Sequence, residues 1–318
     1  MVSSAMLQAF GLFYFATAAV SSYRLSKEED WFRYRSCGRV VQQKLYNAAV
    51  AQGTDAPWLV QIYNIEEQWN SSGFFISDRH VIVSSNAFFH TESFRWILND
   101  TIADMKTCNN RTMRIPNDKL AQISVHSCSD AKPHEDCMNA GALPVVSGHY
   151  IGNCDTNKIP YGFVVLELAS PIETISPLCV PKTRIDKVGD QLMAYGAGGR
   201  FSPGYPEDQT PGFLPVSVIA TCQDHHNLPA SWSVCFDHVG ACDGDLGGPV
   251  VKSVRGQQYG VAVLSNFDCR PNSPRSKHVS VSEFAPQICK LTGICQWMLG
   301  EPTNATTKTS ELNPTLVE

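Results

Sequence analysis

The stretch Gly244-Asp245-Leu246-Gly247-Gly248-Pro249 carries the most information in this sequence. Glycine and proline make up four of its six residues, the composition of a turn rather than of a helix or strand. Its central residue, Leu246, has no oxygen atom that a neighbouring base could activate for nucleophilic attack. The loop therefore stands out both for its glycines and for the aliphatic side chain at its centre.

Outward from this loop, the chain consists of short apolar runs separated by Gly, Pro, Asn and Asp. Many short runs that are rich in β-branched residues predict an all-β sandwich or barrel. Near the end the period changes, because Phe284, Ile288, Leu291, Cys295 and Met298 fall at helical spacing and predict one amphipathic helix. The predicted strands include residues 58–62, 74–76, 81–83, 163–166, 216–219, 260–264 and 279–281.

The central loop resembles the active-site loop of trypsin-like serine proteases, Gly-Asp-Ser-Gly-Gly-Pro, with Leu246 in place of the serine. Five such matches at fixed spacing occur by chance in roughly 10⁻⁴ to 10⁻³ of chains this long, given average Gly and Pro contents. The resemblance implies an all-β fold of two antiparallel six-stranded β-barrels with a C-terminal α-helix. Further segments follow in the family's order between about residues 37 and 298, namely 56–60, 72–87, 161–168, 176–181 and 196–198.

The resemblance identifies the positions of the catalytic triad. Asn86 stands at the histidine position, Gly162 at the aspartate position and Leu246 at the nucleophile position. In the working triad, histidine takes the serine proton while aspartate orients and stabilises the imidazolium. None of the three residues present can do this chemistry, so we expect no catalytic residue. The oxyanion-loop remnant, Gly244 and Asp245, is retained.

The resemblance also implies a changed substrate pocket. Gly240 stands where trypsin carries an aspartate, so no anion awaits a Lys or Arg side chain. The family's Ser-Trp-Gly strand is matched by Leu264-Ser265-Asn266, and His278 replaces a pocket-lining glycine. A bulky side chain there would fill the pocket, so peptide binding in the family's manner is not expected.

Active members of the family are cut to create a new amino terminus that pairs with the aspartate preceding the nucleophile. That position is Asp245, and Lys44-Leu45-Tyr46-Asn47-Ala48 lies where the cleavage sequence would be. Two interpretations stay open. Either the chain is cut after Lys44 and Cys37 tethers the N-terminal segment, or it is uncut and Asp245 accepts hydrogen bonds from its own loop.

The cysteines test the resemblance. The family's bridge beside the catalytic histidine would join the positions of Ala87 and Ser71, so both partners are missing together. The resemblance implies three retained pairs, Cys37–Cys179, Cys222–Cys235 and Cys242–Cys269. The other six cysteines allow 15 connectivities, which stay open. Four of the six lie in an expected disulfide-bonded insertion between Asn86 and Gly162, and the six are Cys108, Cys128, Cys137, Cys154, Cys289 and Cys295.

The length of 318 residues fits one large all-β domain or two small ones. Residues 5–20 form an apolar run followed by small residues and then charge, as in a signal peptide, and are too short to cross a bilayer comfortably. A buried N-terminal helix is the alternative. We expect a signal peptide at 1–22, a pro-segment-like extension at 23–44, a trypsin-like homologue domain at 45–299 and a disordered tail at 300–318.

Composition indicates an extracellular protein. Twelve cysteines fit an oxidising compartment, and four Asn-X-Ser/Thr sequons are potential glycosylation sites. The net charge of −5 and the lack of a basic cluster in the sequence argue against nucleic acid or membrane as partner. We therefore expect a secreted glycoprotein that binds another extracellular protein and has no cofactor. The sequons are Asn70, Asn99, Asn110 and Asn304.

Other sites are less well supported. His225-His226 and His238 lack recurring ligands at metal-binding spacing, and the spacings of Cys128, Cys137 and Cys154 are not those of zinc sites, so we expect no metal. The alternative function is a hydrolase that uses unconventional residues, for example His90 as base. A cationic defence protein is disfavoured by the net charge. The partner, its pathway and the oligomeric state stay open.

Overall fold

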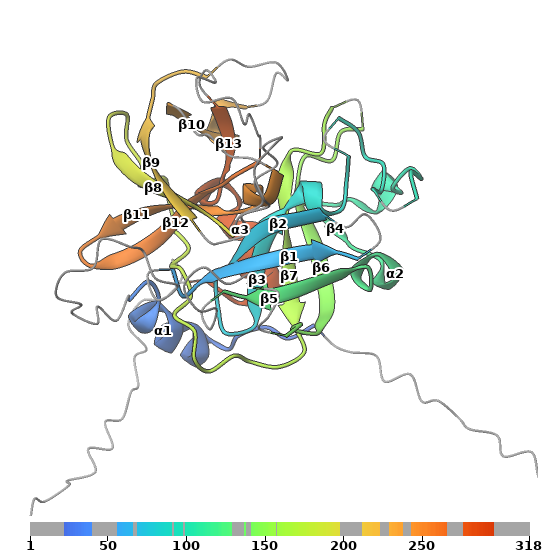
Figure 1. The fold of residues 1–318 in the computed structure, drawn as a ribbon, viewed down its shortest axis with the longest axis horizontal. Coiled ribbons are helices and arrows are strands. Elements are labelled where there is room, and N and C mark those ends of the chain that lie inside the picture. Colours follow the sequence, from blue (N-terminus) through green and yellow to red (C-terminus); the bar gives the residue numbers. More distant parts are fainter. Residues whose placement is uncertain are drawn as a thin grey trace, which may run out of the picture.

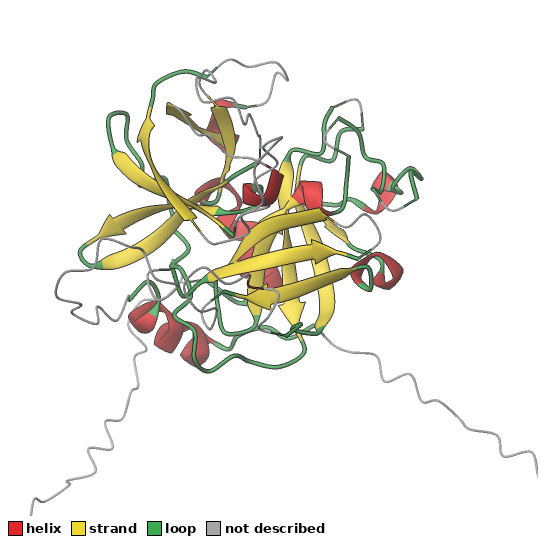
Figure 2. Ribbon diagram, viewed as in Figure 1, coloured by secondary structure: helices red, strands yellow, loops and turns green. Residues whose placement is uncertain are grey.

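The structure is a computed structural model in which two β modules and three helices account for the regular secondary structure described (Figures 1 and 2). The leader, the segment around Lys44, Gly240, the Cys242–Cys269 pair, Asn304 and the tail lie outside the described residues. Those residues are 22–39, 56–65, 69–90, 92–97, 99–128, 137, 141–156, 158–197, 212–222, 229–237, 243–265 and 276–295.

The first module is a seven-stranded antiparallel sheet with the order β4-β6-β7-β3-β2-β1-β5. The runs at 58–62, 81–83 and 163–166 form strands that have a neighbour on each side, because β-branched and aromatic side chains pack well on a pleated surface that is buried on both faces. Its strands are β1 (Leu59–Asn64), β2 (Trp69–Phe75), β3 (His80–Ser84), β4 (Thr112–Arg114), β5 (Ile123–Ser127), β6 (Val145–Gly152) and β7 (Gly162–Leu168).

The second module is a closed antiparallel barrel of six strands with the order β10-β13-β12-β11-β8-β9. It begins at β8 and therefore follows the first module along the chain. In Figure 1 the first module runs from blue to green and the second from yellow to orange. Its strands are β8 (Gln191–Gly196), β9 (Gly212–Val218), β10 (Ser233–Asp237), β11 (Pro249–Val254), β12 (Gln257–Val263) and β13 (Ser276–Ser280).

These modules confirm the expected all-β, trypsin-like fold class, with two differences from the expected pair of six-stranded barrels. The strand pairing closes only the second module into a barrel, while the first is a sheet whose edge strands β4 and β5 do not pair with each other. The first module has seven strands rather than six, since the three-residue β4 adds to the edge beside β6. This strand comes from the long segment between Asn86 and Gly162 that the sequence marked as an insertion. Two disulfides, Cys108–Cys154 and Cys128–Cys137, lie within that segment.

The helices are α1 (Lys27–Ser36), α2 (Asn117–Leu120) and α3 (Ala285–Thr292). The predicted C-terminal helix is present but shorter than its apolar period suggested. It stops because Gly293 adopts φ +79°, a left-handed conformation that ends helices and costs glycine little. Cys295 therefore lies beyond the helix, where it pairs with Cys289, and Met298 lies outside the described residues.

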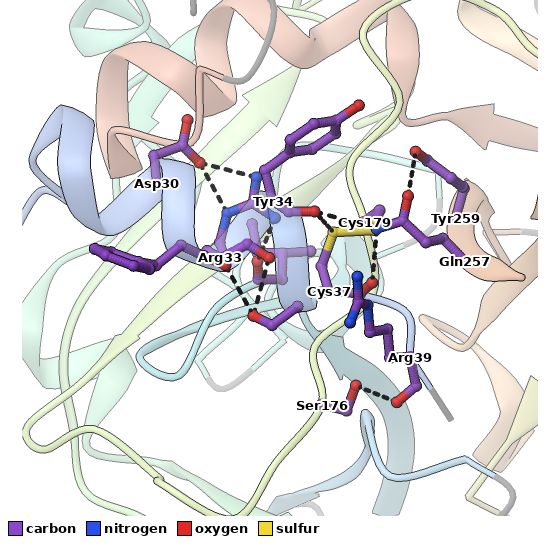
Figure 3. The surroundings of a disulfide bond; sticks show 12 residues. Asp30, Arg33, Tyr34, Cys37, Arg39, Ser176, Cys179, Gln257 and Tyr259 are labelled. Atoms are coloured by element: carbon purple, nitrogen blue, oxygen red, sulfur yellow. Dashed lines mark hydrogen bonds and ion pairs between the residues drawn. A yellow bond between two sulfur atoms is a disulfide. The ribbon is translucent and has the colours of Figure 1, made fainter. Parts of the chain in front are cut away.

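The helix α1 lies in the expected pro-segment-like extension, where no apolar periodicity predicts a helix. Ser26 caps it and Glu29 completes a capping box, so local polar contacts start the helix without an apolar stripe. Its end is fastened by the Cys37–Cys179 disulfide, the pairing that the resemblance implies (Figure 3). Gln257 adds to this anchor, because its side-chain amide donates to the carbonyls of Tyr34 and Cys37 at 3.1 and 3.3 Å.

The larger core fills the first module and extends to α3. Trp58, Phe74 and Phe163 are fully buried in it, and Phe163 meets Phe284 edge to face at 5.6 Å between ring centroids. The chain thus returns from the second barrel to pack its last helix on the first module. Among the described residues, no helix combines the length and apolarity needed to span a membrane.

Candidate functional site

The glycine-rich loop is held where the two modules meet. The Ser72 amide of β2 donates to the Leu246 carbonyl at 2.7 Å. Gly247 has φ +91°, and a Cβ atom there would collide with the Ser72 carbonyl and lie 2.7 Å from the Ser84 amide nitrogen. A Cβ atom on Gly248 would likewise collide with the Tyr195 carbonyl of β8. The glycines are needed because backbone from both modules contacts the loop directly.

Ser72 is a site residue that the sequence reasoning missed. Its hydroxyl donates to the Gly244 carbonyl at 2.7 Å and accepts from the Ala197 amide, also at 2.7 Å. One buried side chain therefore joins β2, the central loop and the end of β8. A sequence signal existed, since Ser72 stands at the first position of the family's Gly-Gly pair, where no side chain is usual.

The three triad-equivalent positions come together around this loop. Asn86 lies in a 3-10 turn, Ser85–Ala87, that directly follows β3, and Gly162 begins β7, which pairs with β3. Leu246 adjoins them, because Gly247 approaches the backbone of Ser84. The backbone thus places the three positions that the resemblance identifies near one another.

The side chains at these positions offer no proton transfer. Asn86 is buried, and its amide nitrogen lies 3.5 Å from the Ser265 carbonyl. Leu246 is 5% exposed, so even its methyl groups are largely hidden from solvent. The loop before it, Asp243–Asp245, forms one turn of 3-10 helix.

Gly162 lacks not only a side chain but also space for one. A Cβ atom there would collide with the Ile151 carbonyl of β6 and lie 2.8 Å from Gly152 Cα and 2.9 Å from the Tyr150 ring. Gly152 pairs directly with Gly162, so the two strands approach closely at this point. An aspartate at this position would need the β6 edge to move.

The pocket-equivalent residues form a buried contact rather than an open site. His278 of β13 is fully buried, and its Nδ1 accepts a hydrogen bond from the Ser265 amide at 3.1 Å. Burial lowers the pKa of His278 to about 3, because the imidazolium would lose its hydration. The ring also lies 5.7 Å from the ring of Phe236. His278 is therefore neutral at physiological pH.

Asp245 keeps a structural position in the central loop. Its carboxylate lies directly against Gly196 at the end of β8, so closely that a Cβ atom on Gly196 would overlap it. Lys44, the proposed cleavage point, lies outside the described residues. Both interpretations of Asp245, as partner of a new amino terminus or as acceptor within its own loop, therefore stay open.

The other predicted residues that the structure describes have separate surroundings. His90 is about half exposed and faces Asp100 at 3.6 Å. Cys222 pairs with Cys235 at the start of β10, as the resemblance implies. Of the sequons, Asn99 and Asn110 are exposed and Asn70 is half-buried in β2. His225, His226 and His238 lie outside the described residues.

The structure also gathers charges that lie far apart in the sequence. Arg35 and Arg39, at the end of α1, and Arg255, in the turn between β11 and β12, line one surface cavity of about 500 Å³. The sequence showed no such cluster, because the disulfide of Cys37 is what brings the two segments together. The other lining residues, Tyr34, Gly256 and Gln257, carry no negative charge.

Comparison with known proteins agrees with this architecture. A segment of 116 residues is 30% identical to vitamin K-dependent protein C from Equus caballus and covers 32% of this chain and 74% of that protein. Its counterpart from Felis catus is 28% identical over the same length. The profile of the nematode trypsin-6-like family matches residues 9–295, almost the whole chain. This chain is a relative of the trypsin-like serine proteases and belongs to the nematode trypsin-6-like family.

Proposed function

We propose that this protein is a catalytically inactive serine protease homologue that is secreted and acts by binding another extracellular protein. The observation that carries the proposal is the set of residues at the triad positions. By the resemblance, Asn86, Gly162 and Leu246 stand at the positions of a protease's base, orienting carboxylate and nucleophile. The closeness of these three positions in the fold supports the assignment. Loss of a triad costs roughly 10⁶ in turnover in a protease where it was measured.

The alternative, a hydrolase with unconventional residues, has Ser265 and His278 as its best pair. The contact between them uses the Ser265 backbone amide, so the imidazole Nδ1 already accepts a hydrogen bond from the backbone and not from the Ser265 hydroxyl. A general base works best when its pKa lies near the operating pH, and that of His278 is about 3. This pair is therefore a poor catalyst, and binding is the better proposal.

Secretion is supported by two independent features. The apolar run at 5–20 has the length of a signal-peptide core. Five disulfides join cysteines of the described chain, and such bonds persist in oxidising compartments. Glycosylation at the exposed Asn99 and Asn110 would follow from passage through the secretory pathway.

The decisive experiment treats the purified, secreted protein with a fluorophosphonate probe and with a peptide library. We expect neither covalent labelling nor turnover above the buffer rate, while trypsin in the same assay is labelled and active. A Ser265→Ala variant is the matched control, because any signal that it abolishes would identify Ser265 as a nucleophile. Labelling of the wild-type protein at any residue would contradict the proposal.

The binding part needs its own measurement. The tagged protein is incubated with extracellular fluid from its source, and captured proteins are then tested one by one for saturable binding to the pure chain. A partner that binds with a defined Kd and is not cleaved supports the proposal. A captured protein that is cleaved by the pure chain would instead favour the hydrolase.

A further inference from the structure

Glu167 is a buried carboxylate that the proposed function does not use. It is the last residue but one of β7 and is 5% exposed. The Ser147 hydroxyl donates to its Oε2 at 2.7 Å, and the backbone amide of Tyr23 donates to its Oε1 at 2.7 Å. The Ser22 hydroxyl lies at 3.1 Å from Oε2. The first two described residues, Ser22 and Tyr23, therefore both form hydrogen bonds with this side chain.

The partners seen around Glu167 are all neutral. Within the described chain, no Lys or Arg forms an ion pair with it. His80 lies directly opposite on β3, but burial lowers the pKa of this imidazole to about 4, so it carries no charge near neutral pH. Buried charges in proteins are as a rule paired with an opposite charge. Glu167 is thus a buried carboxylate that accepts hydrogen bonds from neutral donors and has no ion-pair partner among the described residues.

Tyr23 is held in place by more than its amide. Its carbonyl lies 3.3 Å from His80 Nε2, and the Arg79 guanidinium lies 4.4 Å above its ring. Its hydroxyl donates to Glu29, the residue that completes the capping box of α1. The next contact along the chain joins the Leu25 amide to the Thr292 carbonyl at 2.8 Å. The backbone nitrogen of residue 23 is therefore fixed on Glu167 by its surroundings.

We propose that the mature protein begins at Tyr23 and that its α-ammonium group binds the Glu167 carboxylate. The expected leader ends at Ser22, so hydrolysis of the Ser22–Tyr23 bond turns the observed amide into an amine. One water is consumed, Ser22 leaves as a carboxylate, and the new amine takes up a proton near neutral pH. The resulting cation lies where the amide nitrogen now contacts Glu167 at 2.7 Å.

The inference depends on the secretion proposed above, and it makes a separate claim about one contact. It gives the N-terminal segment a role, because the ion pair would fasten residues 23–26 to β7. The Cys37–Cys179 disulfide then fastens the other end of the same segment.

The first measurement is the intact mass and N-terminal sequence of the protein purified from culture medium. Tyr23 as the first residue supports the inference, and any other first residue overturns it. Failure of the chain to reach the medium would contradict the proposed secretion as well. A correct terminus with no ion pair would overturn this inference alone.

The second measurement is the rate at which the α-amine reacts with an acylating reagent at pH 7.5, read by mass spectrometry with the lysines as internal standards. A bound ammonium gives up its proton reluctantly, and each unit by which its pKa rises slows acylation tenfold. We expect the wild-type amine to react about tenfold more slowly than that of Glu167→Gln. The matched control is Glu173→Gln, an exposed glutamate after β7, which should react like wild type.

A variant of the mature chain with Gly-Ser added before Tyr23 guards against misfolding of Glu167→Gln. Its amine is displaced from an intact Glu167 and should be acylated at the fast rate. Equal rates in wild type and in this extended chain would overturn the inference, whatever the behaviour of Glu167→Gln.

Discussion

Ser72 shows how much a single hydroxyl can contribute at the junction of the two modules. We expect Ser72→Ala to lower the free energy of unfolding by about 2–3 kcal/mol, since the Gly244 carbonyl and the Ala197 amide both lose a buried partner. Urea unfolding followed by fluorescence measures this change.

The adjacent Ser71 is the matched control. It is equally buried, but its hydroxyl has no hydrogen-bond partner in the described chain. Ser71→Ala should therefore be neutral or slightly stabilising, because an unpaired polar group leaves the interior. If both variants lost the same stability, the bridging role of Ser72 would be wrong.

Gly162 determines whether the triad could be rebuilt. We expect Gly162→Asp to destabilise the protein by more than about 3 kcal/mol, because the side chain would collide with the β6 backbone. The double variant Asn86→His with Leu246→Ser should fold, since neither change meets β6, yet show no peptide turnover above background. Thermal unfolding measures the stability of each variant, and a peptide cleavage assay measures turnover. A triple variant that folds and cleaves peptides would refute this account.

At the scale of elements, α1 depends on a buried ion pair. Asp30 and Arg33 are almost fully buried and 2.8 Å apart, and the second Asp30 oxygen accepts from the Cys295 amide at 2.7 Å. Asp30→Asn leaves the guanidinium without its counter-charge, so we expect a loss of about 3–5 kcal/mol in stability. Hydrogen exchange should rise first in residues 27–36.

Glu28→Gln is the matched control on the same helix. Glu28 is exposed in the first turn, where removal of its charge should cost less than about 1 kcal/mol through the helix dipole. Similar exchange rates in α1 for the Asp30→Asn and Glu28→Gln variants would show that the ion pair does not hold the helix.

The same helix marks the limit of prediction from sequence. The strands β1, β3 and β7 were located because their apolar runs reflect burial on both faces of a sheet. The helix α1 was not, since it has no apolar stripe and much of its support comes from contacts with distant residues such as Gln257 and Cys295. Its capping box is a local signal that the sequence does carry, but apolar periodicity does not detect it. A local pattern also overestimated α3, because one left-handed glycine ended it.

The candidate site divides in the same way. The triad positions could be read from motif order, because the family's loops keep their sequence even without catalysis. The collision at Gly162 and the bridge through Ser72 could not, since both depend on how closely strands approach in three dimensions. The surface cavity lined by Arg35, Arg39 and Arg255 could not be predicted either, because the Cys37–Cys179 disulfide brings its two segments together.

At the scale of the whole molecule, buried histidines in both modules predict a loss of stability in acid. His80 in the first module and His278 in the second have pKa values lowered by burial from 6.5 to about 4 and about 3. Below pH 6.5 the unfolded chain therefore binds protons that the folded chain does not. Stability is fully present above that pH and falls as pH decreases toward about 4, by about 1.4 kcal/mol per histidine and pH unit.

Urea unfolding between pH 7 and pH 5 measures this slope before most carboxyl groups titrate. His278→Gln should reduce it by about 1.4 kcal/mol per pH unit, because the amide oxygen can still accept from the Ser265 backbone but cannot be protonated. His80→Gln, at the other histidine whose pKa is lowered by burial, should reduce the slope by a similar amount. A slope that was the same in all three proteins would mean that both histidines are protonated in the folded state, and their burial would then need another explanation.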